Sequence, residues 1–253
     1  MKIRTTKFRL NIDSISLILV LFMLSSCTEM VRPTIDLKFT NSINGNPIAL
    51  HDLAYTNAAG NQYDIMRLKY LISTIKLHES NGNEVLLEDV HFVDSENTSS
   101  IYLESPLKIP VGNYTSISFI FGLDETMNIS NAYVSEDFHN TMAWPDAMGG
   151  GYHYMRLEGA YNHSDGTEHF YNTHLGRWQQ FDNYIEYIVP ISMNASQHEA
   201  YEISIDMNVN NWYAIPHLYN FEDFEAGIMG NLTAQDLLSA NGVDVFGVAV
   251  LKK

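Results

Sequence analysis

Thiols and positive charges are both scarce in this chain. Its 253 residues include one cysteine, and 14 lysines and arginines stand against 30 aspartates and glutamates, which gives a formal net charge of −16. A single cysteine excludes an intramolecular disulfide and a zinc site built from several thiolates. The negative charge argues against nucleic acid as a partner, because binding a phosphate backbone requires clustered positive charge.

Common catalytic motifs are missing as well. The chain has no Gly-x-Ser-x-Gly nucleophile elbow, and His198-Glu199 lacks the second histidine of a zinc-protease motif. The three glycines at 149–151 are not followed by Gly-Lys-Ser/Thr, so they do not form a phosphate-binding loop. Paired carboxylates such as Asp146 and Glu158 would suit a glycosidase, but such pairs arise easily in so acidic a chain. We therefore expect a protein that is not an enzyme.

The single cysteine follows a segment typical of secreted proteins. A basic start precedes the apolar run 15–24, which is too short to span a bilayer and suits the core of a signal peptide. Leu-Ser-Ser-Cys at 24–27 has the pattern of a bacterial lipobox. We predict removal of the signal peptide 1–26 and lipidation of Cys27, which would anchor the protein to the membrane. Thr28 follows in place of the aspartate that retains lipoproteins at the inner membrane, which favours the outer membrane. An ordinary signal peptide with an incidental cysteine is the alternative.

After a short tether at 27–34, patterns of β-strands dominate the domain 35–253. Apolar and polar residues alternate in many short segments separated by turn residues. Asn81-Gly82 between two apolar runs predicts a hairpin. Short helices are expected at 135–142, capped by Ser135, and at 233–240, capped by Thr233 and closed by Gly242. We predict a mainly β fold, a β-sandwich with two or three short helices. The predicted strands lie at 35–40, 63–77, 112–124, 151–159, 168–175, 184–193, 201–209 and 243–253.

Two histidines fall in consecutive predicted strands. Alternation places His153 and Met155 on one face of the strand 151–159. In an antiparallel hairpin with an even-length loop, the residue numbers of two directly opposed residues add up to an odd number. His174 is then opposed by His153, Met155 or Leu157, and in each case it lies on the face of His153. Cross-strand neighbours have Cβ atoms about 5 Å apart, close enough for two imidazoles to bind one ion. An odd loop or a bulge would place the two on opposite faces. Two core histidines satisfied by backbone groups are the alternative.

Metal chemistry follows from the residues that remain available. Without a thiol, a site for a soft metal must use imidazole and thioether, a donor set that suits Cu(I). Met148 and Met155 flank His153 and are candidates for a third ligand. The glycines 149–151 would let the backbone pass close to a ligand, or else form a bulge at the entry to a strand.

One family resemblance adds to this interpretation. "MAWPDAMGGGYHYMRLEG" followed by "YNTHLG", with "FTNSINGNPIAL" before and "IMGNLTAQDLLSANGVDVFGV" after, resembles the MbnP-like family of copper-binding proteins over roughly residues 35–250. The family is named for a methanobactin-associated periplasmic protein. The resemblance implies a secreted β-rich domain with a histidine-based copper site. It also implies oxidation of a nearby tryptophan to a kynurenine by a di-haem peroxidase-like partner.

By position, the resemblance makes Trp144 the candidate for oxidation and His174 the histidine of the His-Leu-Gly motif. The sequence departs from the family pattern at Asp146, where many members have a second tryptophan. We therefore predict a lipoprotein that binds copper, as Cu(I), through His153, His174, Met148 and Met155. It would act in copper acquisition, storage or delivery on the periplasmic or outer side of the outer membrane. The alternative is a surface module that binds glycans on exposed aromatic residues, or binds a protein partner.

Overall fold

A computed structural model describes residues 31–52, 55–103, 106–178, 181–224 and 227–253. The predicted signal peptide and lipobox lie outside the described residues. Arg32–Lys253 forms one compact unit. Within the described ranges, no helix has the length and apolar character needed to cross a membrane.

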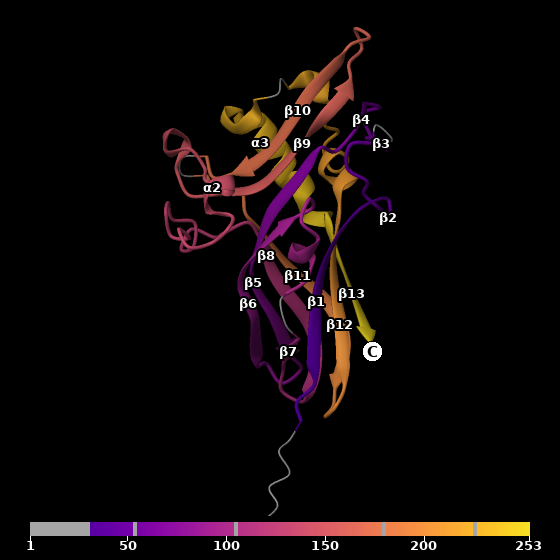
Figure 1. Cartoon of the computed structure of the whole chain (residues 1–253), viewed down its shortest axis with the longest axis vertical. Coiled ribbons are helices and arrows are strands. Elements are labelled where there is room, and N and C mark those ends of the chain that lie inside the picture. The colour runs from indigo at the N-terminus through magenta and orange to yellow at the C-terminus, as the bar shows by residue number, and fades with distance from the viewer. Residues whose placement is uncertain (1–30, 53–54, 104–105, 179–180, 225–226) are drawn as a thin grey trace, which may run out of the picture. The chain divides into compact units, whose positions relative to one another are not determined.

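Two β-sheets make up this unit, which confirms the predicted β-sandwich class (Figure 1). The smaller sheet has the order β13-β12-β1-β2, with β7 also paired to β1, and β1 runs parallel to β12. The larger sheet has the order β11-β8-β5-β9-β4-β3, with β10 paired to β9 and β6 paired to β5. The strands of the smaller sheet are β1 (Thr34–Ile43), β2 (Asn46–Pro47), β7 (Leu107–Lys108), β12 (Ala200–Asn208) and β13 (Phe246–Lys252). Those of the larger sheet are β3 (Tyr55–Thr56), β4 (Gln62–Tyr63), β5 (Arg67–Glu79), β6 (Glu84–Asp94), β8 (Gly112–Phe121), β9 (His153–Asn162), β10 (Glu168–Gly176) and β11 (Ile185–Ala195).

Alternating apolar residues of the two sheets form the core between them. In β1 every second residue from Ile35 to Phe39 is buried, as the sequence alternation predicts. Phe246 of the smaller sheet packs against Tyr70 and Phe119 of the larger sheet, with ring centroids 6.0 and 5.6 Å apart. Burial of these rings removes large apolar areas from water and holds the sheets face to face.

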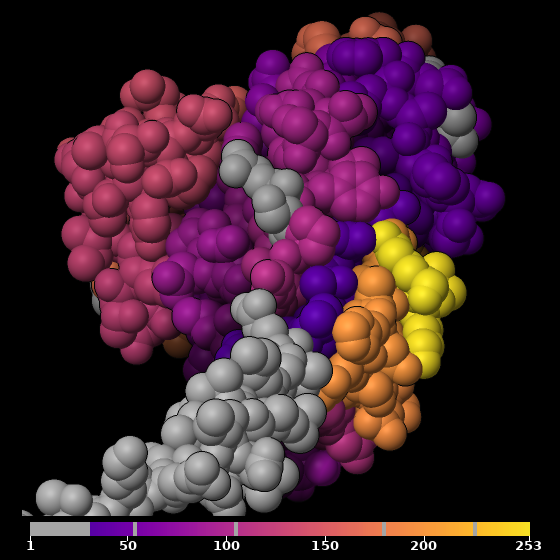
Figure 2. Space-filling model, turned by 60° about the horizontal axis from the view of Figure 1, so that its bottom comes forward, coloured from indigo at the N-terminus to yellow at the C-terminus, as the bar shows by residue number. Residues whose placement is uncertain are grey.

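The β9–β10 hairpin extends from the larger sheet beyond the end of β8. One edge of β5 pairs first with β9, through Arg67–Tyr70, and then with β8, through Ile72–Glu79. The long connection between β8 and β9 contains α2 (His139–Met142) and η2 (Asp146–Met148), and it stands beside the sheet as a rose-coloured lobe in Figure 2. α3 (Leu232–Asn241), which precedes the last strand β13 in the chain, contacts β10.

The helix predictions are correct in place but not in detail. The helix expected at 135–142 is wrong in length, because only the four residues of α2 are helical and Phe138 is its N-cap. The residues before α2 form turns, in which the Tyr133 ring packs on Phe138. The main-chain N–H of Tyr133 donates to the Tyr152 hydroxyl. The C-terminal helix ends at Gly242 as expected, but its N-cap is Asn231, whose side chain accepts the Ala234 N–H, instead of Thr233.

Two hairpins test the turn predictions. Asn81-Gly82 joins β5 to β6 as predicted, with Gly82 at a φ of 91°. The β9–β10 loop, however, has five residues, 163–167, so the expectation of an even loop is wrong. His174 consequently stands opposite Arg156 and not opposite His153, Met155 or Leu157. The physical reason is the longer turn at His163–Thr167, closed by the His163 N–H bonding to the Thr167 carbonyl.

Candidate metal centre

A β-bulge near the base of the hairpin brings the two predicted histidines together. Leu175 pairs with Met155, but the next residue, Gly176, pairs with His153, so Tyr154 is the extra residue on β9. A bulge reverses which face the following side chains occupy. The odd loop and the bulge therefore offset each other, and the rings of His153 and His174 lie with centroids 5.1 Å apart and planes at 83°.

His153 is held as a neutral ring with one free nitrogen. Its side chain is buried, and Nδ1 lies 3.1 Å from the main-chain carbonyl oxygen of Met142 in α2. A carbonyl only accepts, so Nδ1 carries the proton and Nε2 carries the lone pair. Burial, and then the neighbouring His174, lower the pKa of His153 to about 3. Nε2 is buried and has no hydrogen-bond partner, so a lone pair is available at neutral pH.

His174 is oriented from the opposite side by a carboxylate. Its Nε2 lies 2.9 Å from Oε1 of Glu158, and its side chain is only 12% exposed. Gln235 of α3 donates to the main-chain carbonyl of His174 at 2.7 Å, which fixes the end of β10. Because Nε2 donates to Glu158, the neutral form of the ring has its lone pair on Nδ1.

Glu158 is fixed in its ionised state. Arg156 Nη2 lies 2.7 Å from Oε1, and Arg67 Nη1 contacts Oε2. Burial raises the pKa of Glu158, but the hydrogen bonds from His174 and Arg156 outweigh it and lower the pKa to about 2. A general acid needs a raised pKa, so this carboxylate is poorly suited to the glycosidase role considered from the sequence.

Trp144 closes one side of the histidine pair. Its ring contacts His153 edge-on, with centroids 4.6 Å apart, and it is only 3% exposed. It lies so close to Gly176 that a Cβ at that position would be 2.6 Å from Cε3 of the indole. The glycine of the His-Leu-Gly motif thus leaves the space that Trp144 fills.

The three consecutive glycines close the loop that carries Trp144. All three have positive φ, at 119°, 69° and 84° for Gly149, Gly150 and Gly151, a region that other residues rarely adopt. The Trp144 N–H bonds to the Gly151 carbonyl at 2.9 Å, so the chain returns on itself within a few residues. A Cβ on Gly151 would lie 2.2 Å from the Asn128 side chain, so this position excludes larger residues.

The two methionines are placed differently from the histidines. Met155 pairs with Leu175 and Tyr70, is fully buried, and belongs to the hydrophobic core on the face of β9 opposite Arg156. The prediction that Met155 shares a face with His174 is therefore wrong, because it relied on an even loop. Met148 is half-buried in η2, and its carbonyl lies 3.4 Å from the indole Nε1 of Trp144. Coordination by either thioether stays a prediction.

The separation of the two rings suits a shared metal ion. With metal–nitrogen bonds of about 2 Å, two imidazoles on one tetrahedral ion have ring centroids roughly 5 Å apart. The observed 5.1 Å agrees with this geometry. Each ring also has one nitrogen bound to an oxygen acceptor, as metal-binding histidines usually do. The residues present therefore fit a metal held between His153 and His174.

Comparison with known proteins gives the family. The family model for MbnP matches residues 32–230. The chain belongs to the MbnP family. Its fold is similar to the solved structure of MbnP from Methylosinus trichosporium, with a TM-score of 0.53 and 12% sequence identity, covering 86% of this chain and 98% of that one. A search of curated proteins found no match.

The resemblance to MbnP-like proteins noted in the sequence is thus confirmed. Sequence reasoning nevertheless missed several residues that position the site in this MbnP-family chain. Glu158 was considered only as half of a carboxylate pair, although it orients His174. Buried Asn183 donates to the Gly176 carbonyl at 2.7 Å and to Gln235 at 3.3 Å, which links the end of β10 to α3. No local motif marks these contacts, because their partners are far apart in the chain.

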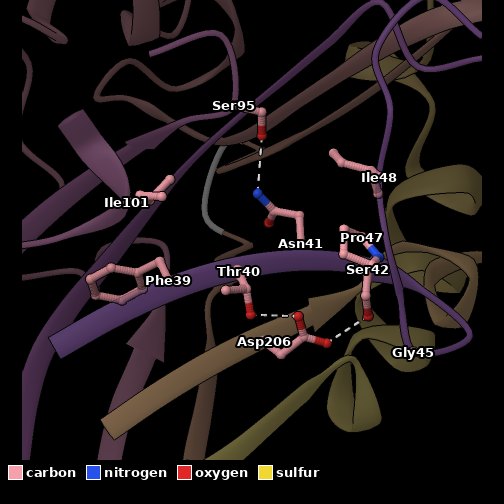
Figure 3. A pocket seen from close by; sticks show the side chains of 10 residues that line it. All are labelled: Phe39, Thr40, Asn41, Ser42, Gly45, Pro47, Ile48, Ser95, Ile101 and Asp206. Atoms are coloured by element: carbon pink, nitrogen blue, oxygen red, sulfur yellow. Dashed lines mark hydrogen bonds between the residues drawn. The ribbon is translucent and has the colours of Figure 1, made fainter. Parts of the chain in front are cut away.

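A cavity of this MbnP-family chain beside β1 offers less to a ligand than the His153–His174 pair. It has a volume of about 410 Å³, and Asp206 is among the residues that line it (Figure 3). Thr40 and Ser42 both donate to the Asp206 carboxylate at 2.6 Å, and Asn41 donates to Ser95 at 3.0 Å. These polar groups satisfy one another, in contrast to the free Nε2 of His153.

Proposed function

We propose that this MbnP-family protein binds one copper ion, as Cu(I), between His153 and His174. The observation that carries the proposal is the buried, unpartnered Nε2 of His153 beside a second imidazole at ligating distance. An unpaired buried acceptor is costly, and a bound cation removes that cost. Neutral imidazoles without a thiolate suit copper among the soft metals, and Met148 would be a weaker third ligand. The role is acquisition, storage or delivery, without catalysis.

The test is a competition titration with a Cu(I) chelator under reducing conditions. His153→Ala and His174→Ala should each weaken Cu(I) binding at least about tenfold, since even residues behind a ligand contribute that much. His217→Ala is the matched control, because His217 is exposed and lies outside the site. Circular dichroism of each variant separates loss of binding from loss of folding. Equal affinity of all three variants and wild type would place copper elsewhere.

We also propose that Trp144 is oxidised to a kynurenine by a di-haem peroxidase-like partner. Trp144 contacts His153, so a modified side chain would lie beside the metal. Trp144 and His139 are among the residues that line a cavity of about 310 Å³. Peptide mass spectrometry of protein purified from its native host tests this step. Unmodified Trp144 in copper-loaded native protein would contradict it.

We further propose that the protein is an outer-membrane lipoprotein anchored through Cys27. The lipobox pattern supports this, and a periplasmic setting agrees with the family resemblance. The alternative of a glycan-binding module has weaker support. Stacking on sugars needs exposed aromatic faces, but Trp144 and Trp212 are 3% and 0% exposed, which leaves Tyr102, Phe170 and Phe181 as the strongly exposed rings among the described residues.

A further inference from the structure

A second group of metal-binding side chains lies at the tip of the β9–β10 hairpin. His163, Asp165 and His169 each offer one ligand atom, and these atoms lie within 4.8 Å of one another. None of them belongs to the His153–His174 site, because the tip lies several residues away from the bulge along both strands. We propose that this hairpin tip binds a divalent transition-metal ion of the Zn²⁺ type through His163, Asp165 and His169.

Distances within the tip match those of ligands on one ion. His163 Nδ1 lies 3.2 Å from Asp165 Oδ1, and His169 Nε2 lies 3.3 Å from Asp165 Oδ2. With bonds of about 2.1 Å, two ligands on a tetrahedral ion are roughly 3.4 Å apart. The ligand atoms therefore lie close enough for the three side chains to bind one ion once the histidine rings have turned.

One histidine at the tip already presents a lone pair, whereas His169 Nε2, which donates to the Thr167 hydroxyl oxygen at 3.1 Å, must release its proton when it binds a metal. The main-chain N–H of Asp165 points at His163 Nδ1 at 3.0 Å, so this nitrogen presents its lone pair, as a ligand must. Metal binding exchanges this hydrogen bond for coordination. The other ring nitrogen, Nε2, lies 3.7 Å from the Glu222 carboxylate, which is too long for a hydrogen bond but places a negative charge behind the ring.

Asp165 is held ready as an ionised ligand. Its Oδ1 accepts hydrogen bonds from the Thr167 hydroxyl at 2.7 Å and the Thr167 N–H at 2.8 Å. These bonds keep the pKa of Asp165 well below its ordinary value and leave Oδ2 facing His169. Glu222 is also tied to the tip, since it accepts the N–H and the hydroxyl of Ser164. The carboxylates of Asp165 and Glu222, whose pKa values are both lowered by their hydrogen bonds, together carry a charge of −2, which complements a divalent cation.

One rearrangement is required. The rings of His163 and His169 are stacked, with centroids 4.2 Å apart and planes at 17°. A ligating imidazole directs its lone pair in the plane of the ring, so nearly parallel rings cannot both coordinate the same ion. His169 is 43% exposed and therefore free to turn about its side-chain bonds. Binding should unstack the pair, which gives the experiment a direct signature.

The test is a titration of the full-length protein with Zn²⁺, followed by NMR of the histidine rings. One equivalent of Zn²⁺ should shift the ring signals of His163 and His169. Asp165→Asn and His169→Ala should each weaken the binding of this Zn²⁺ ion at least about tenfold. His217→Ala should leave its affinity unchanged. A Zn²⁺ ion that binds at His153 and His174 would do so in all these variants, so it does not affect the comparison between them.

The contrary results are equally specific. Zn²⁺ that shifts only the rings of His153 and His174, or that binds Asp165→Asn and His169→Ala as tightly as wild type, would overturn the proposal. So would the absence of any binding at the tip below millimolar Zn²⁺. None of these outcomes depends on copper binding, so failure here and failure of the proposed function are separable.

Discussion

Acidification of the metal-free protein should reveal the buried state of His153. In the unfolded chain its pKa would be the ordinary 6.5, and in the fold it is about 3. Below pH 6.5 His153 binds a proton in the unfolded state but not in the folded state, so the free energy of unfolding decreases as the pH falls. The contribution of neutral His153 to the free energy of unfolding is fully present above pH 7 and declines steadily toward pH 3.

The magnitude follows from the two pKa values. Each pH unit between them costs about 1.4 kcal/mol. Lowering the pH from 7 to 5 should therefore reduce the free energy of unfolding by about 2 kcal/mol through His153 alone. Glu158 does not add to this change, because its pKa is lowered from 4.5 to about 2 and its contribution is lost only below pH 4.5.

The assay is urea unfolding at pH 7 and pH 5, for wild type and for His153→Gln. Both proteins contain His91, whose pKa is also lowered by burial, so its contribution cancels in the comparison. Wild type should lose about 2 kcal/mol more than His153→Gln over this interval. Equal losses would refute the conclusion that His153 stays neutral in the fold, and with it the lone pair available to copper.

Two further predictions concern the surroundings of the site, and a third concerns the membrane anchor. Gly176→Ala should lower stability by about 1–3 kcal/mol in thermal unfolding, because its Cβ would overlap the Trp144 ring, whereas Gly247→Ala, with no atom within 4 Å of its Cβ, should not. Glu158→Gln should weaken Cu(I) binding about 10–100-fold in chelator competition, since it removes the charge that orients His174, and unchanged affinity would contradict this role. Cys27→Ala should move the protein out of the membrane fraction, and wild type that retains a free Cys27 thiol would contradict lipidation.

Short-range patterns in the sequence were sufficient for most strands and for the β5–β6 turn. Alternation marked β1 and β12 because each has one buried face along most of its length. Asn81-Gly82 fixed its hairpin because few other dipeptides adopt positive φ at so little cost. The sandwich class could therefore be predicted from these patterns, whereas the family was indicated by the resemblance of longer segments such as "MAWPDAMGGGYHYMRLEG".

The register of β9 and β10 could not be predicted, because it depends on loop parity and on a bulge. "HSDGT" at 163–167 accommodates turns of more than one length, and a one-residue difference reverses every side chain. The bulge at Tyr154 has no sequence signature of its own. The predicted even loop and the unforeseen bulge were two errors that cancelled for the His153–His174 pair. Met155 lies on the loop side of the bulge, so only the loop error affected it, and its predicted face was wrong.

The two histidine groups differ in burial and charge, and this difference determines which ion each should prefer. Transfer of an ion from water into a protein costs more as its charge rises, so a buried site favours a monovalent ion. Around His153 and His174 the negative charge of Glu158 is already offset by Arg156 and Arg67, which leaves no excess negative charge to attract a divalent cation. The hairpin tip has the opposite character, because it is exposed to water and carries two carboxylates beside its imidazoles. Cu(I) at the buried pair and a divalent ion at the tip are therefore the assignments that burial and charge favour.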